Sequence, residues 1–316
     1  MGVPCRGVLP RPLTWILAGV LLGGLAWAAP IARAGLKPVL LVPIYVFPHS
    51  WGVNEYVRLI NLQKRYPNLP IVAIVNVDFD GPDWKTNPGY RAQMGEIVRS
   101  LAGAGIVVLG YASSSYTRRP FQGDPKGSGF GSDLRTNVDR WIRFFPQVRG
   151  IFVDEMCYSL TLYRDQQHPC LPLEASRAPV GQAEGRPYRD VMAYYRAVYA
   201  YIRLSKGLEL VIANPGQTVP PAFFDGSVAD ALIVYEGSEA YFDPTVYPLG
   251  GNPDRTGLLL YNDPAPFALP KLRAVLGKVG FFYVTDAMLV DGKLNPWAAL
   301  PRYLEELADY LASPQP

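Results

Sequence analysis

Two short apolar stretches of the chain each run into acidic residues whose types and positions suit acid and base chemistry. Residues 150–153 lead into Asp154 and Glu155, and residues 231–235 lead into Glu236. Large apolar residues in a row need a buried strand, so the carboxylates that follow must reach the rim of a core. Carboxyl groups paired at such a rim can protonate a leaving oxygen and activate a nucleophile. We predict that these three acids meet at one end of a barrel and cleave a glycosidic bond.

The geometry of strands limits how the acids combine. Side chains alternate along a strand, so Asp154 and Glu155 cannot both point into a barrel while their strand stays regular. The ends of the fourth and sixth strands lie roughly 10 Å apart, which places a carboxylate of the fourth strand about 5 to 9 Å from Glu236. This range covers both retaining and inverting glycosidases and leaves open which acid protonates the leaving oxygen. Turn formation or helix capping is the alternative use of each acid taken singly.

The elements that must position these acids are short apolar runs alternating with longer amphipathic ones. The predicted strands cover residues 39–46, 71–77, 106–111, 150–154, 208–213, 231–235, 257–261 and 279–284. The predicted helices cover residues 54–66, 90–104, 134–145, 188–205, 270–276 and 297–311, with weaker ones around 221–224 and near 240. Eight such alternations predict one α/β domain over residues 35–316, a single (β/α)8 TIM barrel. A doubly wound sheet is the alternative, and the missing Gly-rich turn after the first strand disfavours it.

Most predicted strands end in a polar residue or a tyrosine, which turn chemistry alone does not explain. Residues at these ends can hold a sugar by hydrogen bonding and ring stacking, although each aromatic can instead serve ordinary packing. The predicted substrate-binding residues of this kind are Tyr45, His49, Asn76, Asp78, Tyr111, Asn214, Tyr235 and Tyr261. Two long loops, residues 112–131 and 156–186, follow the third and fourth strands, on the side of a barrel where active sites are built.

The N-terminal residues are predicted to direct export. Arg6 and Arg11 precede an apolar run over residues 13–29, and small residues at 32 and 34 suit a signal peptidase. We interpret residues 1–34 as a secretion signal and expect a secreted, periplasmic or cell-surface protein. The alternative is an uncleaved membrane anchor, because the run approaches the roughly 20 residues that span a bilayer.

Charge and composition disfavour several other functions. The net charge of +3 falls to about zero when the three arginines of residues 1–34 are removed, which argues against a nucleic-acid partner. The chain has two histidines, His49 and His168, so a zinc site with two histidine ligands would need both, from distant loops. It has no Gly-x-Ser-x-Gly elbow and no phosphate-binding loop. We expect neither a metal nor a cofactor.

Two cysteines, Cys157 and Cys170, remain after the predicted signal is removed. A pair of cysteines in an exported protein predicts a disulfide, with two free thiols as the alternative. The bond would restrain the loop that follows Asp154 and Glu155.

Six segments of the chain, in the same order, resemble the spherulin 4 (spherulation-specific family 4) proteins. They are residues 42–48 with Trp51, residues 74–76 with 81–82, residues 110–111 with Ser115, Tyr116 and Arg118 or Arg119, residues 150–155, residues 214–216 and residues 234–236. The resemblance implies a (β/α)8 fold and endo-acting hydrolysis of an exopolysaccharide containing α-1,4-linked N-acetylgalactosamine. Its acidic catalytic residues then fall on Asp154, Glu155 and Glu236, and Tyr116 joins the substrate-binding set.

Two loops depart from the family pattern, at residues 76–83 and 112–114, so the sugar specificity is less defined than the acidic set. We expect an exported, monomeric endo-acting glycoside hydrolase whose partner is a polysaccharide containing N-acetylgalactosamine or galactosamine. The alternative is a cell-surface protein that keeps the barrel and binds or organises polysaccharide without turnover.

Overall fold

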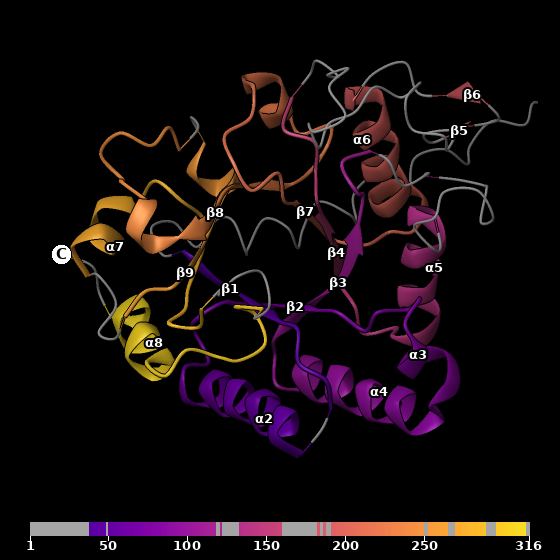
Figure 1. Cartoon of the computed structure of the whole chain (residues 1–316), viewed down its shortest axis with the longest axis horizontal. Helices are drawn as coiled ribbons and strands as arrows, with labels where there is room; N and C mark the ends of the chain where they lie inside the picture. Colours follow the sequence, from indigo (N-terminus) through magenta and orange to yellow (C-terminus); the bar gives the residue numbers. More distant parts are fainter. Residues whose placement is uncertain are drawn as a thin grey trace, which may run out of the picture.

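Eight apolar runs of the sequence form strands that close into a parallel barrel (Figure 1). The computed structural model describes residues 38–48, 50–117, 121, 133–159, 182–183, 186–187, 191–249, 252–264, 269–288 and 295–313. The barrel strands are β1 (Val39–Ile44), β2 (Ile71–Val75), β3 (Val107–Ser113), β4 (Gly150–Asp154), β7 (Leu210–Ala213), β8 (Ala231–Ser238), β9 (Thr256–Tyr261) and β10 (Phe281–Val284). Their order around the barrel is β1-β10-β9-β8-β7-β4-β3-β2. The predicted (β/α)8 barrel is confirmed.

Helices connect the strands and lie around the outside of the barrel (Figure 1). They are α2 (Ser50–Arg65), α3 (Pro82–Thr86), α4 (Pro88–Gly103), α5 (Leu134–Phe144), α6 (Val191–Ala200), α7 (Leu269–Val275) and α8 (Leu304–Ala312). Helix α6 continues as a π-helical turn, and the predicted weak helices near residues 221 and 240 are 3-10 turns. Beyond the barrel, two short antiparallel strands, β5 (Gln182–Ala183) and β6 (Arg186–Pro187), pair with each other.

Strand β8 extends three residues beyond its predicted end, so Glu236 lies within the strand and not at its tip. The strand contains a β-bulge: Ile233 pairs with Gly257 and Tyr235 pairs with Leu258, which leaves Val234 as an extra residue. A bulge of this kind redirects the side chains that follow it and is common beside active sites. An apolar run cannot reveal such a shift, because the bulge is set by pairing with β9.

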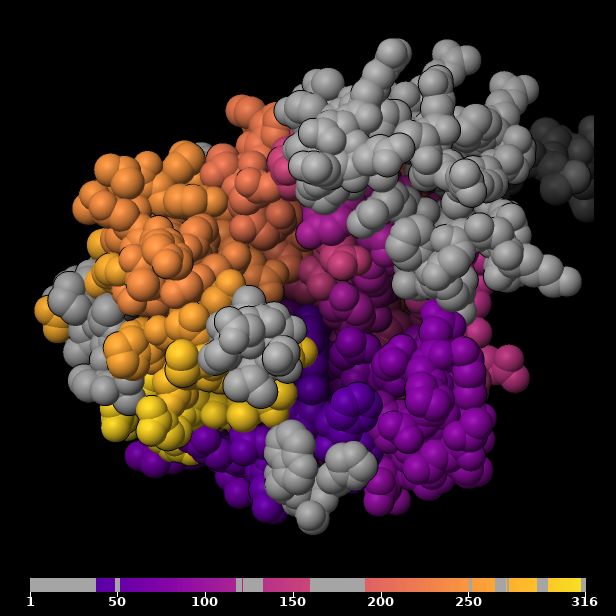
Figure 2. Space-filling view, viewed as in Figure 1, coloured from indigo at the N-terminus to yellow at the C-terminus, as the bar shows by residue number. Residues whose placement is uncertain are grey.

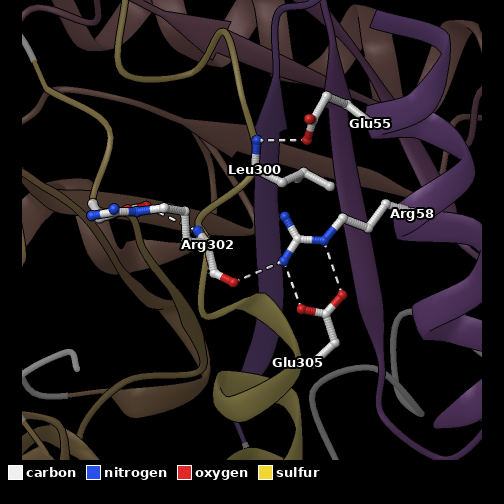
Figure 3. A network of polar contacts seen from close by, with 6 residues as sticks. Glu55, Arg58, Leu300, Arg302 and Glu305 are labelled. Carbon is white, nitrogen blue, oxygen red and sulfur yellow. Dashed lines mark hydrogen bonds and ion pairs between the residues drawn. The ribbon is translucent and has the colours of Figure 1, made fainter. Parts of the chain in front are cut away.

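The last helix starts seven residues later than predicted, at Leu304. Pro301 prevents a helix from running through residues 297–303, because proline cannot donate the backbone hydrogen bond that the helix interior needs. Residues 295–303 instead form an irregular segment that polar contacts fasten to α2 (Figure 3). The Leu300 N–H donates to Glu55 at 3.0 Å, and Arg58 donates to the carbonyl oxygen of Arg302 at 3.1 Å.

Helices α2 and α8 are joined beside this segment by a two-pronged ion pair. Arg58 donates to both carboxylate oxygens of Glu305, at 2.9 and 2.6 Å, as Figure 3 shows. The planar guanidinium matches the carboxylate with two parallel bonds, which fixes direction as well as distance. The network therefore determines where residues 300–305 lie.

Gly150, at the start of β4, is required by the close approach of neighbouring backbone. A β-carbon added there would lie 2.0 Å from the carbonyl oxygen of Leu210 on β7 and 2.7 Å from the side chain of Leu109 on β3. Both neighbours belong to the barrel sheet and cannot move away independently. Glycine at this position therefore allows β4 to sit between its partners.

We predict that Gly150→Ala destabilises the protein by about 1–3 kcal/mol or more, because the new methyl group overlaps backbone of the barrel. The matched control is Gly103→Ala at the end of α4, where an added β-carbon meets nothing within 4 Å. The control should be neutral or stabilising by up to about 1 kcal/mol, since alanine favours helix. Chemical denaturation of the two variants measures both changes, and equal stability would contradict the packing argument.

Candidate active site

Two of the predicted acids, Asp154 and Glu236, come together through one side-chain amide. Asp154 ends β4, Asn214 follows β7, and Glu236 lies on β8, so the three residues come from adjacent strands of the barrel. The Asn214 side-chain nitrogen donates to Asp154 Oδ1 at 2.7 Å and also donates to Glu236 Oε2. Two oxygens bonded to one nitrogen are at most about 6 Å apart. The carboxylates therefore lie close enough to act on one bond.

The second oxygen of each carboxylate also accepts a hydrogen bond. The Tyr111 hydroxyl donates to Asp154 Oδ2 at 2.8 Å. The Trp297 indole N–H donates to Glu236 Oε1 at 3.0 Å. Both acids are thus fixed in orientation from two sides, as a site that must align reacting groups requires.

Burial shapes the protonation of this pair. Burial, and after it the charge of Glu236, raise the pKa of Asp154 to about 7. Hydrogen bonds to Asp154 lower this pKa, and the one from Tyr111 has the largest effect among them. Burial also raises the pKa of Glu236, while hydrogen bonds from Asn214 and Trp297 lower it. Losing both protons would place two like charges side by side in a poorly solvated position. The pair therefore keeps one proton near neutral pH, so one member can act as an acid and the other as a base.

Glu155 reaches the same region by a turn of the backbone. Its φ of 53° lies in the left-handed region, so β4 ends at Asp154 and the next residue departs from strand alternation. The Ser113 hydroxyl donates to Glu155 Oε2, and Ser113 is the β3 residue that pairs with Asp154. The Glu155 carbonyl oxygen accepts from the Ser114 hydroxyl at 2.8 Å and from the Tyr116 N–H at 2.7 Å. The third acid therefore lies beside the first, held by the end of β3.

Three tyrosines surround the paired acids. The rings of Tyr45 and Tyr111 meet edge to face, with centroids 5.4 Å apart. Burial, followed by the charges of Asp154 and then Glu236, raises the pKa of Tyr45, and burial followed by the charge of Glu236 raises that of Tyr261. The hydroxyl groups consequently stay protonated at neutral pH and remain available as hydrogen-bond donors.

Other predicted substrate-binding residues lie away from the pair or serve the backbone. Tyr235 alternates with Glu236 on β8, and its ring packs on Phe242 and Tyr247 at centroid distances of 4.9 and 5.0 Å. Asn76 accepts a hydrogen bond from the backbone N–H of Asp78 at 2.9 Å, which closes a local turn. The Asp78 side chain is exposed. Asn76 therefore has the alternative role of a polar residue at a strand end, which is to form a turn.

Several predictions fall on residues that the structure does not describe. His49, Cys170 and residues 1–34 lie outside the described ranges. Cys157 is buried next to β4, and its pairing with Cys170 stays a prediction. Over the described part of the chain, no helix has the length and apolarity to span a membrane, and no cluster of three metal-binding side chains occurs.

Trp297 and Ser113 touch the acids but were absent from the predicted site. Ser113 lies two residues beyond Tyr111 on β3, so the two-residue period of a strand was a usable signal for it. Trp297 follows Glu236 by 61 residues, in a segment that was predicted to be helical. Nothing local in the sequence marks it, because the segment between β10 and α8 brings it to the site.

The surface of the molecule is hollowed at its centre. Figure 2 shows indigo residues in a depression near the centre of this face, between an orange side and a magenta and purple side. Tyr45 and Phe47 follow β1, and Tyr45 is electrostatically coupled to Asp154 and Glu236. Tyr45 therefore links the end of β1 to the acid pair.

Comparisons with known proteins agree with this architecture. The sequence model of spherulation-specific family 4 matches residues 39–311. Spherulin-4 of Physarum polycephalum is 23% identical over 222 residues, covering 66% of this chain and 51% of the relative, so the chain spans about half the length of that protein. The crystal structure of Aspergillus clavatus Sph3 in complex with GalNAc superposes with a TM-score of 0.61 at 20% identity, over 88% of this chain and 99% of Sph3. The shared fold is a barrel of the same kind.

We predict that Asp154→Asn changes the pH dependence of stability. The pKa of Asp154 is raised to about 7 in the folded protein, so protonation stabilises the fold, and this contribution is lost as pH rises through that value. The variant has no proton to lose there. Its melting temperature relative to the parent should therefore increase as pH rises from about 4 to about 8.

The matched control is Asp225→Asn. Hydrogen bonds from Ser227 lower the pKa of Asp225, so this carboxylate contributes stability above its unfolded pKa and the contribution is lost as pH falls. Its variant should be least stable, relative to the parent, at neutral pH. Thermal melts at several pH values measure both trends, and parallel curves for Asp154→Asn and the parent would contradict the shift.

Proposed function

Because the chain belongs to spherulation-specific family 4, whose sequence model matches residues 39–311, we propose that it is a glycoside hydrolase that cuts within an amino-sugar polysaccharide. One observation carries the proposal: Asp154 and Glu236, two partly buried carboxylates, bind the same Asn214 amide on adjacent strands of a closed barrel. Glycosidases act through a pair of carboxyl groups with separate acid and base roles. Active sites of parallel barrels lie at the C-terminal ends of their strands, where this pair lies.

The hydrogen-bond partners favour Asp154 as the acid. The Tyr111 hydroxyl beside Asp154 can donate to a carboxylate or accept from a protonated carboxyl, so it suits either state. The Trp297 indole beside Glu236 is a donor only and prefers the ionised state. In the proposed reaction the Asp154 proton passes to the glycosidic oxygen as the bond from that oxygen to the anomeric carbon breaks. Ionised Glu236 attacks that carbon or takes a proton from the water that does so.

Glu155 is assigned the third role, orientation of the sugar. The Ser113 hydroxyl holds its carboxylate at the end of β3. A carboxylate in this position can accept hydrogen bonds from hydroxyl or amide groups of a sugar ring. Tyr45 and Tyr261 add aromatic surface and protonated hydroxyls around the same space.

We propose as substrate an exopolysaccharide containing α-1,4-linked N-acetylgalactosamine or galactosamine. The support is that Sph3, which has the same barrel fold, was solved in complex with GalNAc. The loops at residues 76–83 and 112–114 differ from the family pattern and are where a different sugar would be selected. Cleavage within the polymer is part of the proposal and is tested by the size of the released products.

The protein is further proposed to act outside the cytoplasm as a monomer. Residues 1–34 would direct export, and a Cys157–Cys170 bond would form after it. Mass spectrometry of the exported protein, with and without reduction, measures both features. A product that keeps residues 1–34 would support an anchor in place of a cleaved signal.

We predict that Glu236→Gln and Asp154→Asn each lower the rate of polymer cleavage by at least about 100-fold, because each removes one half of an acid and base pair. The matched control is Glu209→Gln, just before β7, where the carboxylate forms a partly exposed ion pair with Arg149. This control should keep full activity, since exposed ion pairs contribute little.

Release of reducing ends from purified galactosaminoglycan, followed by mass spectrometry of the products, measures cleavage. A parent protein that binds the polymer and releases no reducing ends would support the non-catalytic alternative. Release from other polymers alone would move the proposal to another glycan. Full activity in both acid variants would overturn the catalytic assignment.

A further inference from the structure

Trp297 contacts the acid pair from the segment just before α8, whereas Tyr111 contacts it from β3 and Asn214 from the end of β7. Its indole N–H lies 3.0 Å from Glu236 Oε1, and the tryptophan is buried, with 6% of its surface exposed. Building on the proposed function, we propose that Trp297 is a positioning residue that orients the Glu236 carboxylate and holds it in the ionised form. Asp154 is then the member of the pair that carries the proton.

The chemistry of the indole supports this assignment. An indole nitrogen has one hydrogen to donate and no lone pair to accept with, so it bonds best to a charged acceptor. Asn214 donates to both acids and cannot by itself distinguish them. Tyr111 can reverse its hydrogen bond when Asp154 gains a proton. The asymmetry of the pair therefore comes from Trp297.

The position of Trp297 is fixed by several contacts. Its ring meets those of Tyr261 and Tyr283 at centroid distances of 6.0 and 5.9 Å. Its carbonyl oxygen accepts from the Tyr45 N–H at 2.8 Å, and its own N–H donates to Asn295 at 2.9 Å. The indole is thus clamped between the ends of β1, β9 and β10, where a small shift would break the bond to Glu236.

The segment that carries Trp297 is anchored outside the site. Figure 3 shows Leu300 bonded to Glu55, and Arg302 bonded through its carbonyl oxygen to Arg58. The Arg302 N–H also donates to Asp286, just after β10, at 3.0 Å. These backbone contacts restrain residues 300–302 on both sides. The restrained residues 295–303 place a hydrogen-bond donor beside Glu236 that the strands do not supply.

Other groups that affect the charge of Glu236 come from the surrounding strands. The titratable residues coupled to it are Asp154 at the end of β4, Tyr45 after β1 and Tyr261 on β9. Asp154 opposes a second negative charge, and the two tyrosines stay neutral at neutral pH. In the described part of the chain, Asn214 and Trp297 are the side chains that stabilise the Glu236 charge by donating hydrogen bonds.

The first test compares Trp297→Phe with Trp84→Phe, because the two tryptophans are nearly equally buried, at 6% and 7% exposed. Both variants lose ring volume, a loss that does not depend on pH. Only Trp297→Phe also raises the pKa of Glu236, which weakens the fold where the acid would be ionised. Its melting temperature relative to the parent should fall further between pH 5 and pH 8, while the deficit of Trp84→Phe stays constant.

Placing both substitutions in a Glu236→Gln background completes the test. Glutamine does not titrate, so the deficit caused by Trp297→Phe should become independent of pH. A deficit of Trp297→Phe that is already constant with pH in the parent background would overturn the proposal. So would a pH-dependent deficit that persists in the Glu236→Gln background.

If Trp297→Phe does not fold, NMR of protein that keeps all its tryptophans tests the same contact. In protein labelled with nitrogen-15 tryptophan, one indole N–H resonance should move as pH rises from 4 to 8, and Glu236→Gln should abolish that movement. If no indole resonance responds to this substitution, the inference is wrong.

Activity provides a readout that separates this inference from the proposed function. Trp297→Phe should lower kcat more than it changes KM, and should shift the acidic limb of the kcat/KM profile upward by about one to two pH units. An inactive parent would overturn the proposed function but leave the stability and resonance tests valid. An active parent with an unshifted profile in Trp297→Phe would overturn the positioning role alone.

Discussion

Two carboxyl groups held close together by one amide are the constraint on which the rest of this structure depends. Asp154 and Glu236 would repel each other and lose hydration if both were ionised in their buried positions. Asn214 offsets part of that penalty by donating to both, and a retained proton removes the remainder. The arrangement is therefore stable only while each acid keeps its own second donor. Tyr111 provides that donor for Asp154 and Trp297 provides it for Glu236.

A closed parallel barrel brings these acids together by its strand order alone. All strands point the same way, so their C-terminal ends meet on one face, and β4, β7 and β8 are neighbours there. The strands below are buried on both faces and exclude water from beneath the acids. The rim is less regular: Asp78, Glu155 and residues 115–117 all have left-handed backbone. Strain of this kind, about 1–3 kcal/mol per residue, persists only where surrounding structure holds it, as at functional sites.

Helices α2 and α8 are coupled to the site through residues 295–303. The Arg58–Glu305 pair is half exposed and contributes little energy by itself. The pair matters because it orients the Arg58 guanidinium, which also binds the carbonyl oxygen of Arg302. This contact restrains the segment that carries Trp297. Precision at the acid pair thus depends on contacts at the outer surface of the barrel.

The sequence by itself determined the element order, the barrel and the strand-end acids, because continuous apolar runs have one favourable environment and charges at their ends must lie at a rim. It also placed Asn214 and Tyr111 among the candidates for the same reason. Only the tertiary structure decided the β8 bulge at Val234, the turn at Glu155 and the arrival of Trp297 at Glu236. These features arise from pairing between strands and from a contact between residues 61 positions apart in the sequence. Local sequence patterns cannot predict such contacts.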